Sequence, residues 1–125
     1  MNIYPEEFSA IFALGENFFS QGYYKKAQTI FHGLIALDNT NHMASIAYGE
    51  SLLMDGQSTK ALAHFSESRK LFPASHRILL GGAKACILLD RKSDAKDFLQ
   101  PIITGHIKVT PDLSREIQDL IARIA

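Results

Sequence analysis

The amino-acid sequence predicts an all-α protein built from three tandem helix-turn-helix units and a C-terminal helix. The first observation is a repeat: residues of the same kind recur every 34 positions along the 125-residue chain. The second is the spacing within each unit, where apolar residues recur at three and four, as on one face of a helix. Four of the recurring series are Gly15, Gly49 and Ala83; Ala27, Ala61 and Ala95; Phe31, Phe65 and Leu99; and Gly22, Gly56 and Asp90.

The first unit, residues 8–41, predicts two helices that cross closely. Gly15 and Ala27 are small, which lets two helix backbones approach, and Phe31 is expected to fill the space one turn further along. Gly22 follows the first helix, where a residue in the left-handed conformation closes a helix without strain at Cβ. The predicted packing stripes are Ile11, Leu14, Gly15 and Phe18 on the first helix and Ala27, Phe31 and Leu34 on the second.

The second and third units, residues 42–75 and 76–109, repeat this arrangement with changes. Pro73 ends the second helix of its unit, because proline lacks the amide that a helix interior needs. Pro101 falls inside the second helix of the third unit, where we expect a kink or an early end.

Both ends of the chain carry helix signals. Pro5 suits the first position of a helix, and the two glutamates that follow are favourable beside its positive end. Thr110 is a candidate N-cap ahead of Pro111, so a final helix is expected over residues 111–124. Stacked repeats need such a cap, because the last repeat would otherwise expose its core. The apolar face of this helix consists of Leu113, Ile117, Leu120, Ile121 and Ile124.

Composition predicts a soluble globular protein with one domain over residues 1–125. Thirteen basic and thirteen acidic residues cancel, which argues against nucleic acid or an anionic membrane as the main partner. The first residues lack the pattern of a signal peptide, and no apolar run is long enough to span a bilayer. The single cysteine, Cys86, fits a reducing compartment, so we expect a cytoplasmic protein.

The sequence does not contain the patterns that favour catalysis or metal binding. None of the five histidines has a second histidine or cysteine four residues away, the spacing of a helical metal site. Cys86 occupies a packing position of the repeat, which favours a buried thiol over a nucleophile. The two glycines of LGGAK, residues 80–84, follow no predicted strand and are better explained by close helix packing. We therefore predict a protein that is not an enzyme and uses no metal or cofactor.

These features resemble the tetratricopeptide repeat. Its pattern has a Leu-Gly pair, an aromatic three residues later, a Gly-x-aromatic turn, an alanine, another aromatic and a final proline. The second unit keeps Pro73 but has Ser58 in place of the turn aromatic, and the third unit is the weakest match. The resemblance covers about four-fifths of the chain and implies a right-handed helical solenoid, a scaffold that carries no particular activity. The matching residues of the first unit are Leu14, Gly15, Phe18, Gly22, Tyr23, Tyr24, Ala27 and Phe31.

In stacked repeats of this type the first helices line the concave side, so their residues outside the packing stripe face a groove. A helix that only packs against its neighbours needs one apolar face, whereas these first helices have two. Monomers seldom leave so large an apolar patch uncovered. The predicted concave groove consists of Phe12, Glu16 and Phe19 in the first unit; Met43, Ile46, Ala47, Glu50 and Leu53 in the second; and Arg77, Leu80, Lys84 and Ile87 in the third.

Three occupants could cover this groove: the protein's own C-terminal helix, a second copy of the chain, or an apolar segment of another protein. We predict the third, with apolar side chains giving affinity and the charged groove residues setting orientation. A carboxylate clamp, as in co-chaperones that grip the acidic terminus of heat-shock proteins, needs a cluster of donors. Of the equivalent positions only Arg77 fits that pattern, since the others hold Phe12, Glu16, Ala47 and Gly81.

Two segments resemble the first and third repeats of the translocator chaperones of bacterial type III secretion: AQTIFHGLIALDNTN (27–41) and GAKACILLDRKSDAKDFL (82–99). The additional N-terminal helix of those chaperones has no counterpart in this sequence, which is more similar to the small co-chaperones that hold the needle subunit. The resemblance implies a bacterial, cytoplasmic chaperone with a role in virulence that keeps an aggregation-prone secretion subunit soluble. A second small co-chaperone is a further implied partner. The alternative is a structural adaptor or a homodimeric scaffold in a larger complex.

Overall fold

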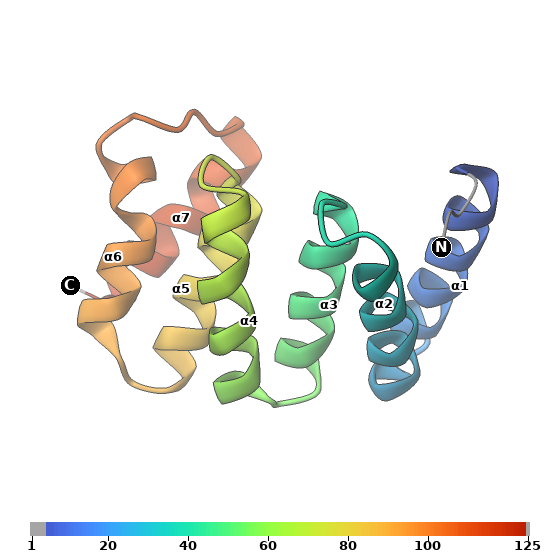
Figure 1. Cartoon of the computed structure of the whole chain (residues 1–125). Helices are drawn as coiled ribbons and strands as arrows, with labels where there is room; N and C mark the ends of the chain where they lie inside the picture. Colours follow the sequence, from blue (N-terminus) through green and yellow to red (C-terminus); the bar gives the residue numbers. More distant parts are fainter. Residues whose placement is uncertain (1–4, 125) are drawn as a thin grey trace. The chain divides into compact units, whose positions relative to one another are not determined.

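The computed structural model describes residues 5–124 and confirms the all-α prediction (Figure 1). No β-strand occurs in this part of the chain. None of its helices combines the length and the apolar character that crossing a lipid bilayer requires. The helices are α1 (Pro5–Ser20), α2 (Tyr24–Leu37), α3 (His42–Met54), α4 (Ser58–Leu71), α5 (His76–Leu88), α6 (Lys92–Ile103) and α7 (Pro111–Ile124).

The helices form two compact units, one ending at Gln57 and the other beginning at Ser58, and each is described by itself. In the first unit α2 packs against both α1 and α3, and in the second α5 packs against α4, α6 and α7 (Figure 1). The hairpins α1–α2 and α5–α6 correspond to the first and third predicted repeats. The two helices of the second repeat, α3 and α4, belong to different units. One domain over the whole chain stays a prediction.

The first helices of the three repeats, α1, α3 and α5, end in the same hydrogen-bonded turn. In each turn an amide just past the helix donates to the carbonyl five residues earlier in the chain. This arrangement satisfies carbonyl groups that a helix end would otherwise leave without a partner. The donor and acceptor pairs are Tyr23 and Phe18 at 2.9 Å, Gln57 and Leu52 at 2.9 Å, and Arg91 and Cys86 at 2.8 Å.

One residue inside each turn has a left-handed backbone, which explains a series that recurs in the sequence. The φ angle is +83° at Gly22, +76° at Gly56 and +56° at Asp90. Glycine adopts this conformation without a steric penalty, and aspartate tolerates it better than most other residues. The prediction that Gly22 closes the first helix is confirmed.

Two helix starts are capped by side chains that the sequence reading did not single out. The Oδ1 atom of Asn41 accepts a hydrogen bond from the amide of Ala44 at 2.9 Å, at the start of α3. One repeat later, Oγ of Ser75 accepts from the amide of Ile78 at 3.3 Å, at the start of α5. In both, the side chain of the N-cap residue accepts from the amide three residues later, as expected of an N-cap. Pro111 is the first residue of α7, as predicted.

Close packing of glycine on phenylalanine sets the spacing of the helices. A Cβ atom added to Gly15 would lie 2.5 Å from a ring carbon of Phe31, so a side chain does not fit there. Phe31 thus lies directly on Gly15, and not one turn further along as the sequence analysis expected. In the second unit Gly81 meets the ring of Phe65 from α4, and Gly82 meets the ring of Phe98 from α6. The interpretation of the two glycines as packing positions is confirmed.

The helix α6 ends early, as its proline predicts. It has 12 residues, whereas α2 and α4 each have 14 and begin at equivalent positions of the repeat. Pro101 lies within the helix, and its carbonyl accepts a hydrogen bond from the amide of Ile107 at 3.0 Å. Gly105, with φ at +80°, provides the left-handed residue of this turn. Because α6 ends at Ile103, the chain can change direction in the segment that leads to α7.

Candidate partner-binding groove

The part of the predicted groove that lies on α1 consists of two half-buried aromatic rings and an exposed carboxylate. The Phe12 ring lies 5.3 Å from the ring of Phe31 and 6.4 Å from that of Phe8, measured between centroids. The Phe19 ring meets Tyr24 edge to face, with the centroids 5.4 Å apart. Both groove aromatics are therefore held by neighbouring rings yet keep part of their surface open to solvent. Glu16, between them on the helix, is exposed.

The stripe on α3 is only partly accessible. Ile46 is 1% exposed, so this predicted groove residue belongs to the protein's own core. Ala44, Ser45 and Ile46 are all buried in succession, which places protein atoms on more than one side of the helix. The second apolar stripe of α3 is thus explained in part by packing. Met43 is 49% exposed, and Ala47, Glu50 and Leu53 are half-buried.

The stripe on α5 is partly covered by the C-terminal helix. Leu80 is 3% exposed, which makes it a core residue like Ile46. The Lys84 ammonium forms an ion pair with Glu116 of α7, and about two-fifths of each side chain remains exposed. Helix α7 packs against α5 and α6 and buries Ile117 and two further apolar residues of its face. Arg77 is exposed and Ile87 is half-buried.

The accessible residues of the predicted groove are therefore fewer than the sequence indicated. Ile46 and Leu80 are excluded from the groove by their burial, because a partner cannot reach side chains whose surface is already covered. That the remaining residues bind a partner stays a prediction, both for the stripes on α1 and α3 and for the stripe on α5. The accessible apolar residues are Phe12, Phe19, Met43, Leu53 and Ile87.

A polar cluster fixes the end of α3 against α2. The Asp55 carboxylate accepts hydrogen bonds from Lys25 at 3.0 Å, Gln28 at 3.1 Å and Gln57 at 2.6 Å. These donors hold the pKa of Asp55 below its ordinary value, with Lys25 the largest cause. The cluster joins α2 to the end of α3 through three hydrogen bonds to one carboxylate, so its role is structural. Gln28 also donates to the carbonyl of Ser51 at 3.3 Å.

The polar groups that could support catalysis are dispersed or occupied. Cys86 is fully buried, and its burial raises the pKa of the thiol, which keeps it in the unreactive protonated form. His64 contacts the hydroxyl of Ser68 at 3.3 Å, and His106 contacts Thr104 at 2.7 Å. Within residues 5–124 no group of three or more His, Cys, Asp or Glu side chains has the arrangement of a metal site.

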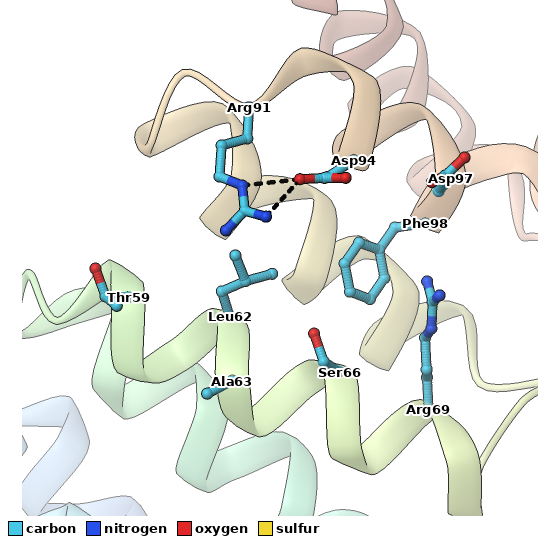
Figure 2. Close-up of a pocket in the computed structure, with 9 residues that line it drawn as sticks. All are labelled: Thr59, Leu62, Ala63, Ser66, Arg69, Arg91, Asp94, Asp97 and Phe98. Atoms are coloured by element: carbon cyan, nitrogen blue, oxygen red, sulfur yellow. Dashed lines mark hydrogen bonds and ion pairs between the residues drawn. The ribbon is translucent and has the colours of Figure 1, made fainter.

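A second surface feature lies between α4 and α6, and the sequence analysis did not predict it. A cleft of about 400 Å³ opens between these two helices, which both pack on α5 (Figure 2). From the sequence, the second helix of each repeat was expected only to pack against its neighbours. The sequence feature that could have indicated the cleft is the spacing of Leu62, Ser66 and Arg69, which places one apolar and two polar side chains along one face of α4.

Comparison with known proteins identifies the fold. No protein-family model matches the chain, and no curated protein matches its sequence. The solved structure of the Yersinia enterocolitica type III secretion chaperone SycD with a peptide of the translocator YopD is similar. It has a TM-score of 0.87 and 17% identity, over 99% of this chain and 96% of SycD. SycD in an alternative dimer gives a TM-score of 0.86 and 19% identity, over the same shares of the two chains.

PcrH, in complex with the chaperone binding region of PopD, is also similar. Its TM-score is 0.86 at 18% identity, and the likeness spans 98% of this chain and 94% of PcrH. Likenesses that cover nearly all of both chains show that this chain has the helical fold of those proteins. At this identity they establish the fold and leave the activity to be argued from the surface.

Proposed function

We propose that the protein is a non-catalytic chaperone that holds an apolar segment of a secreted or assembly-prone protein against its first helices. The observation that carries this proposal is the likeness to SycD and PcrH over nearly the whole chain, because SycD is described with a peptide of the translocator YopD and PcrH with the chaperone binding region of PopD. The accessible apolar residues on α1, α3 and α5 support it, since a partner segment needs uncovered anchors of this kind.

Apolar contacts would provide most of the binding energy. Phe12, Met43 and Leu53 each have apolar surface left to bury. Full burial of such a side chain stabilises a complex by at most about 1.5 to 3 kcal/mol, and the entropy lost on association offsets part of the sum. In the first unit the exposed charge of Glu16 lies between Phe12 and Phe19 on α1 and would help to fix the direction of the segment. The exposed charge of Arg77 would do the same for the stripe on α5.

The proposed client is a subunit of a bacterial type III secretion system, and the proposed location is the cytoplasm, where a chaperone meets its client before export. The fold likeness to SycD and PcrH supports both points. A second small co-chaperone is a further proposed partner. Binding would keep an aggregation-prone segment covered until the client leaves.

The proposal is tested with the protein that co-purifies with this chain from its own cell, identified by mass spectrometry. We expect Met43→Glu and Leu53→Glu to weaken binding of that protein about tenfold or more, because each places a charge in an apolar contact. Phe12→Arg should act in the same direction. The matched control is Leu71→Glu, which alters an apolar side chain that is 56% exposed and lies outside the groove.

Circular dichroism must show that the variants keep their helicity. If Met43→Glu and Leu53→Glu fold normally and bind as tightly as Leu71→Glu, the groove is not the binding site. If the chain purifies with no client at all while the fold is intact, the chaperone function itself is wrong.

A homodimeric scaffold is the second candidate, favoured by the outer face of α1. Ala13 stands two repeats before Gly81, whose surface in α5 is covered by Phe65 of α4. Ala13 is exposed and its neighbour Leu14 is 45% exposed, so the equivalent face of α1 is open to solvent. A second copy could cover it, and SycD is described in an alternative dimer. Sedimentation of the wild type and of Leu14→Glu tests this dimer. If the two copies meet through this face of α1, the charge at position 14 should dissociate them.

A further inference from the structure

The cleft between α4 and α6 is a shaped site on the second helices, apart from the predicted groove on the first helices. It has a volume of about 400 Å³ and lies within the second unit. Figure 2 shows that the lining side chains come from α4, from Arg91 just before α6 and from the first half of α6. The floor is apolar and the rim is charged. The lining residues are Thr59, Leu62, Ala63, Ser66, Arg69, Arg91, Asp94, Asp97 and Phe98.

Packing fixes the aromatic ring of the cleft in place. Phe98 is 4% exposed, and its ring occupies the space that a side chain on Gly82 would need. The guanidinium of Arg69 lies over the same ring, with Cζ 4.4 Å from the ring centroid. A guanidinium that lies over a ring still has N–H groups available to an anion. The contact with Phe98 therefore favours this position of Arg69 before any ligand binds.

The charges of the cleft are unevenly paired. Arg91 donates from Nε to Asp94 at 2.8 Å and forms an ion pair with the same oxygen from Nη2 at 2.7 Å. This pair neutralises the charge at one end of the cleft. Among residues 5–124 neither Arg69 nor Asp97 forms an ion pair, and the Arg69 guanidinium lies over the Phe98 ring. The cleft thus offers one unpaired cation and one unpaired carboxylate.

We propose that this cleft is a second docking site, which takes a segment of a partner protein that presents one carboxylate and a neighbouring apolar side chain. The carboxylate pairs with the Arg69 guanidinium, in the two-bond geometry that arginine forms with carboxylates. The apolar side chain lies against Ala63, the exposed apolar residue of the lining, beside the buried Leu62 and Phe98. Asp97 also lines the cleft and repels a densely acidic segment, so the complementary ligand carries a single carboxylate. This inference does not depend on the proposed function.

A small probe with the same two groups tests the chemistry directly. The probe is 4-phenylbutanoate, titrated into the ¹⁵N-labelled full chain and followed by amide chemical shifts. We expect saturable shifts at Ala63, Ser66, Arg69 and Phe98, with millimolar affinity. The matched neutral probe, 4-phenylbutanamide, should bind about tenfold more weakly or not at all, because it lacks the negative charge and the second oxygen acceptor that a two-bond pair with the guanidinium uses.

Two variants make the test specific to the arginine. Arg69→Gln should abolish the preference for the acid over the amide, whereas Lys92→Gln, which removes an exposed positive charge outside the cleft, should keep it. Equal binding of the two probes to the wild-type chain, an unchanged preference in Arg69→Gln, or shifts confined to α1 and α3 would each overturn the proposal. Sedimentation of the wild type and of Arg69→Gln tests whether a second copy of this chain fills the cleft, because the oligomeric state would then depend on Arg69. A change of oligomeric state in Arg69→Gln would also overturn it.

Discussion

Single residues set how closely the helices of this protein approach. Gly15, Gly81 and Gly82 each face a phenylalanine ring at a distance that leaves no room for Cβ. Helix interiors normally disfavour glycine, by roughly 0.5–1 kcal/mol relative to alanine. Here the close contact with the ring compensates, because the apolar area buried by the ring exceeds what a methyl group would bury.

Gly15→Ala should therefore destabilise the protein in spite of alanine's higher helix propensity. We expect the free energy of unfolding to fall by about 1–3 kcal/mol, because overpacking forces Phe31 or the backbone to move. The matched control is Gly33→Ala in α2, where a Cβ meets no atom within 4 Å. That change should raise stability by about 0.5–1 kcal/mol. Urea unfolding followed by circular dichroism measures both, and equal effects at the two positions would contradict the packing argument.

At Gly56 a substitution measures the cost of a left-handed backbone alone, without a contribution from packing. Its φ is +76° and a Cβ would meet no atom within 4 Å, so any penalty for a side chain comes from the backbone alone. We expect Gly56→Ala to lower the free energy of unfolding by about 1–2 kcal/mol. Gly56→Asn should cost less, as Asp90 indicates at the equivalent position. Thermal unfolding compares the two variants, and an alanine that costs no more than asparagine would disprove this explanation.

At the scale of elements, α3 and α5 begin at a side-chain cap and end in a hydrogen-bonded turn, whereas α7 depends on its packing against α5 and α6. Its apolar face packs on α5 and α6 through Ile117, Leu120 and Ile124, and Glu116 adds the ion pair to Lys84. An ion pair with two-fifths of each side chain exposed adds about 0–1 kcal/mol at most. The apolar face therefore carries most of the attachment.

Ile117→Ala should loosen α7 more than any change to the ion pair does. Ile117 is 5% exposed, and removing such a side chain typically costs about 2–5 kcal/mol through lost burial and the cavity left behind. We expect faster amide exchange in α7 and at Leu80 and Ile87 of α5. Glu116→Gln is the comparison, with an expected loss of about 1 kcal/mol or less. If exchange in α5 is unaffected by Ile117→Ala, α7 does not protect that stripe.

At the scale of the whole molecule, acid should unfold the protein partly through Asp55. Hydrogen bonds from Lys25, Gln28 and Gln57 lower the pKa of this carboxylate in the folded state. The stabilisation is present above the unfolded pKa, about 3.9, and is lost as the pH falls through the lower folded value. Unfolding by urea at a series of pH values should show a decline below about pH 4.

Asp55→Asn should flatten that decline and lower stability near neutral pH. Asp119→Asn is the control, because Asp119 is exposed on α7 and its side chain forms no hydrogen bond or ion pair with another residue of 5–124. A wild-type profile that Asp55→Asn leaves unchanged would show that the cluster does not contribute to acid unfolding.

The sequence predicted the helical fold, its repeat and its turns, because each depends on local chemistry. Gly22, Pro101 and Pro111 act through their own backbone, so their effects could be read without coordinates. The burial of Ile46 and Leu80 could not, since periodicity locates a second apolar stripe but does not reveal which neighbouring helix covers it. The cleft was missed for a similar reason: Arg69 and Phe98 lie 29 positions apart in the chain, and only folding brings them together.

The turn that closes α1, α3 and α5 consists of main-chain hydrogen bonds and one left-handed residue, and it returns every 34 positions. A duplicated block of 34 residues would contain its own hydrogen-bonded turn. It would therefore join the existing chain without any new side-chain interaction. Changes in gene length by whole blocks should therefore be tolerated in evolution, whereas insertion of a single residue within the closure would disturb it.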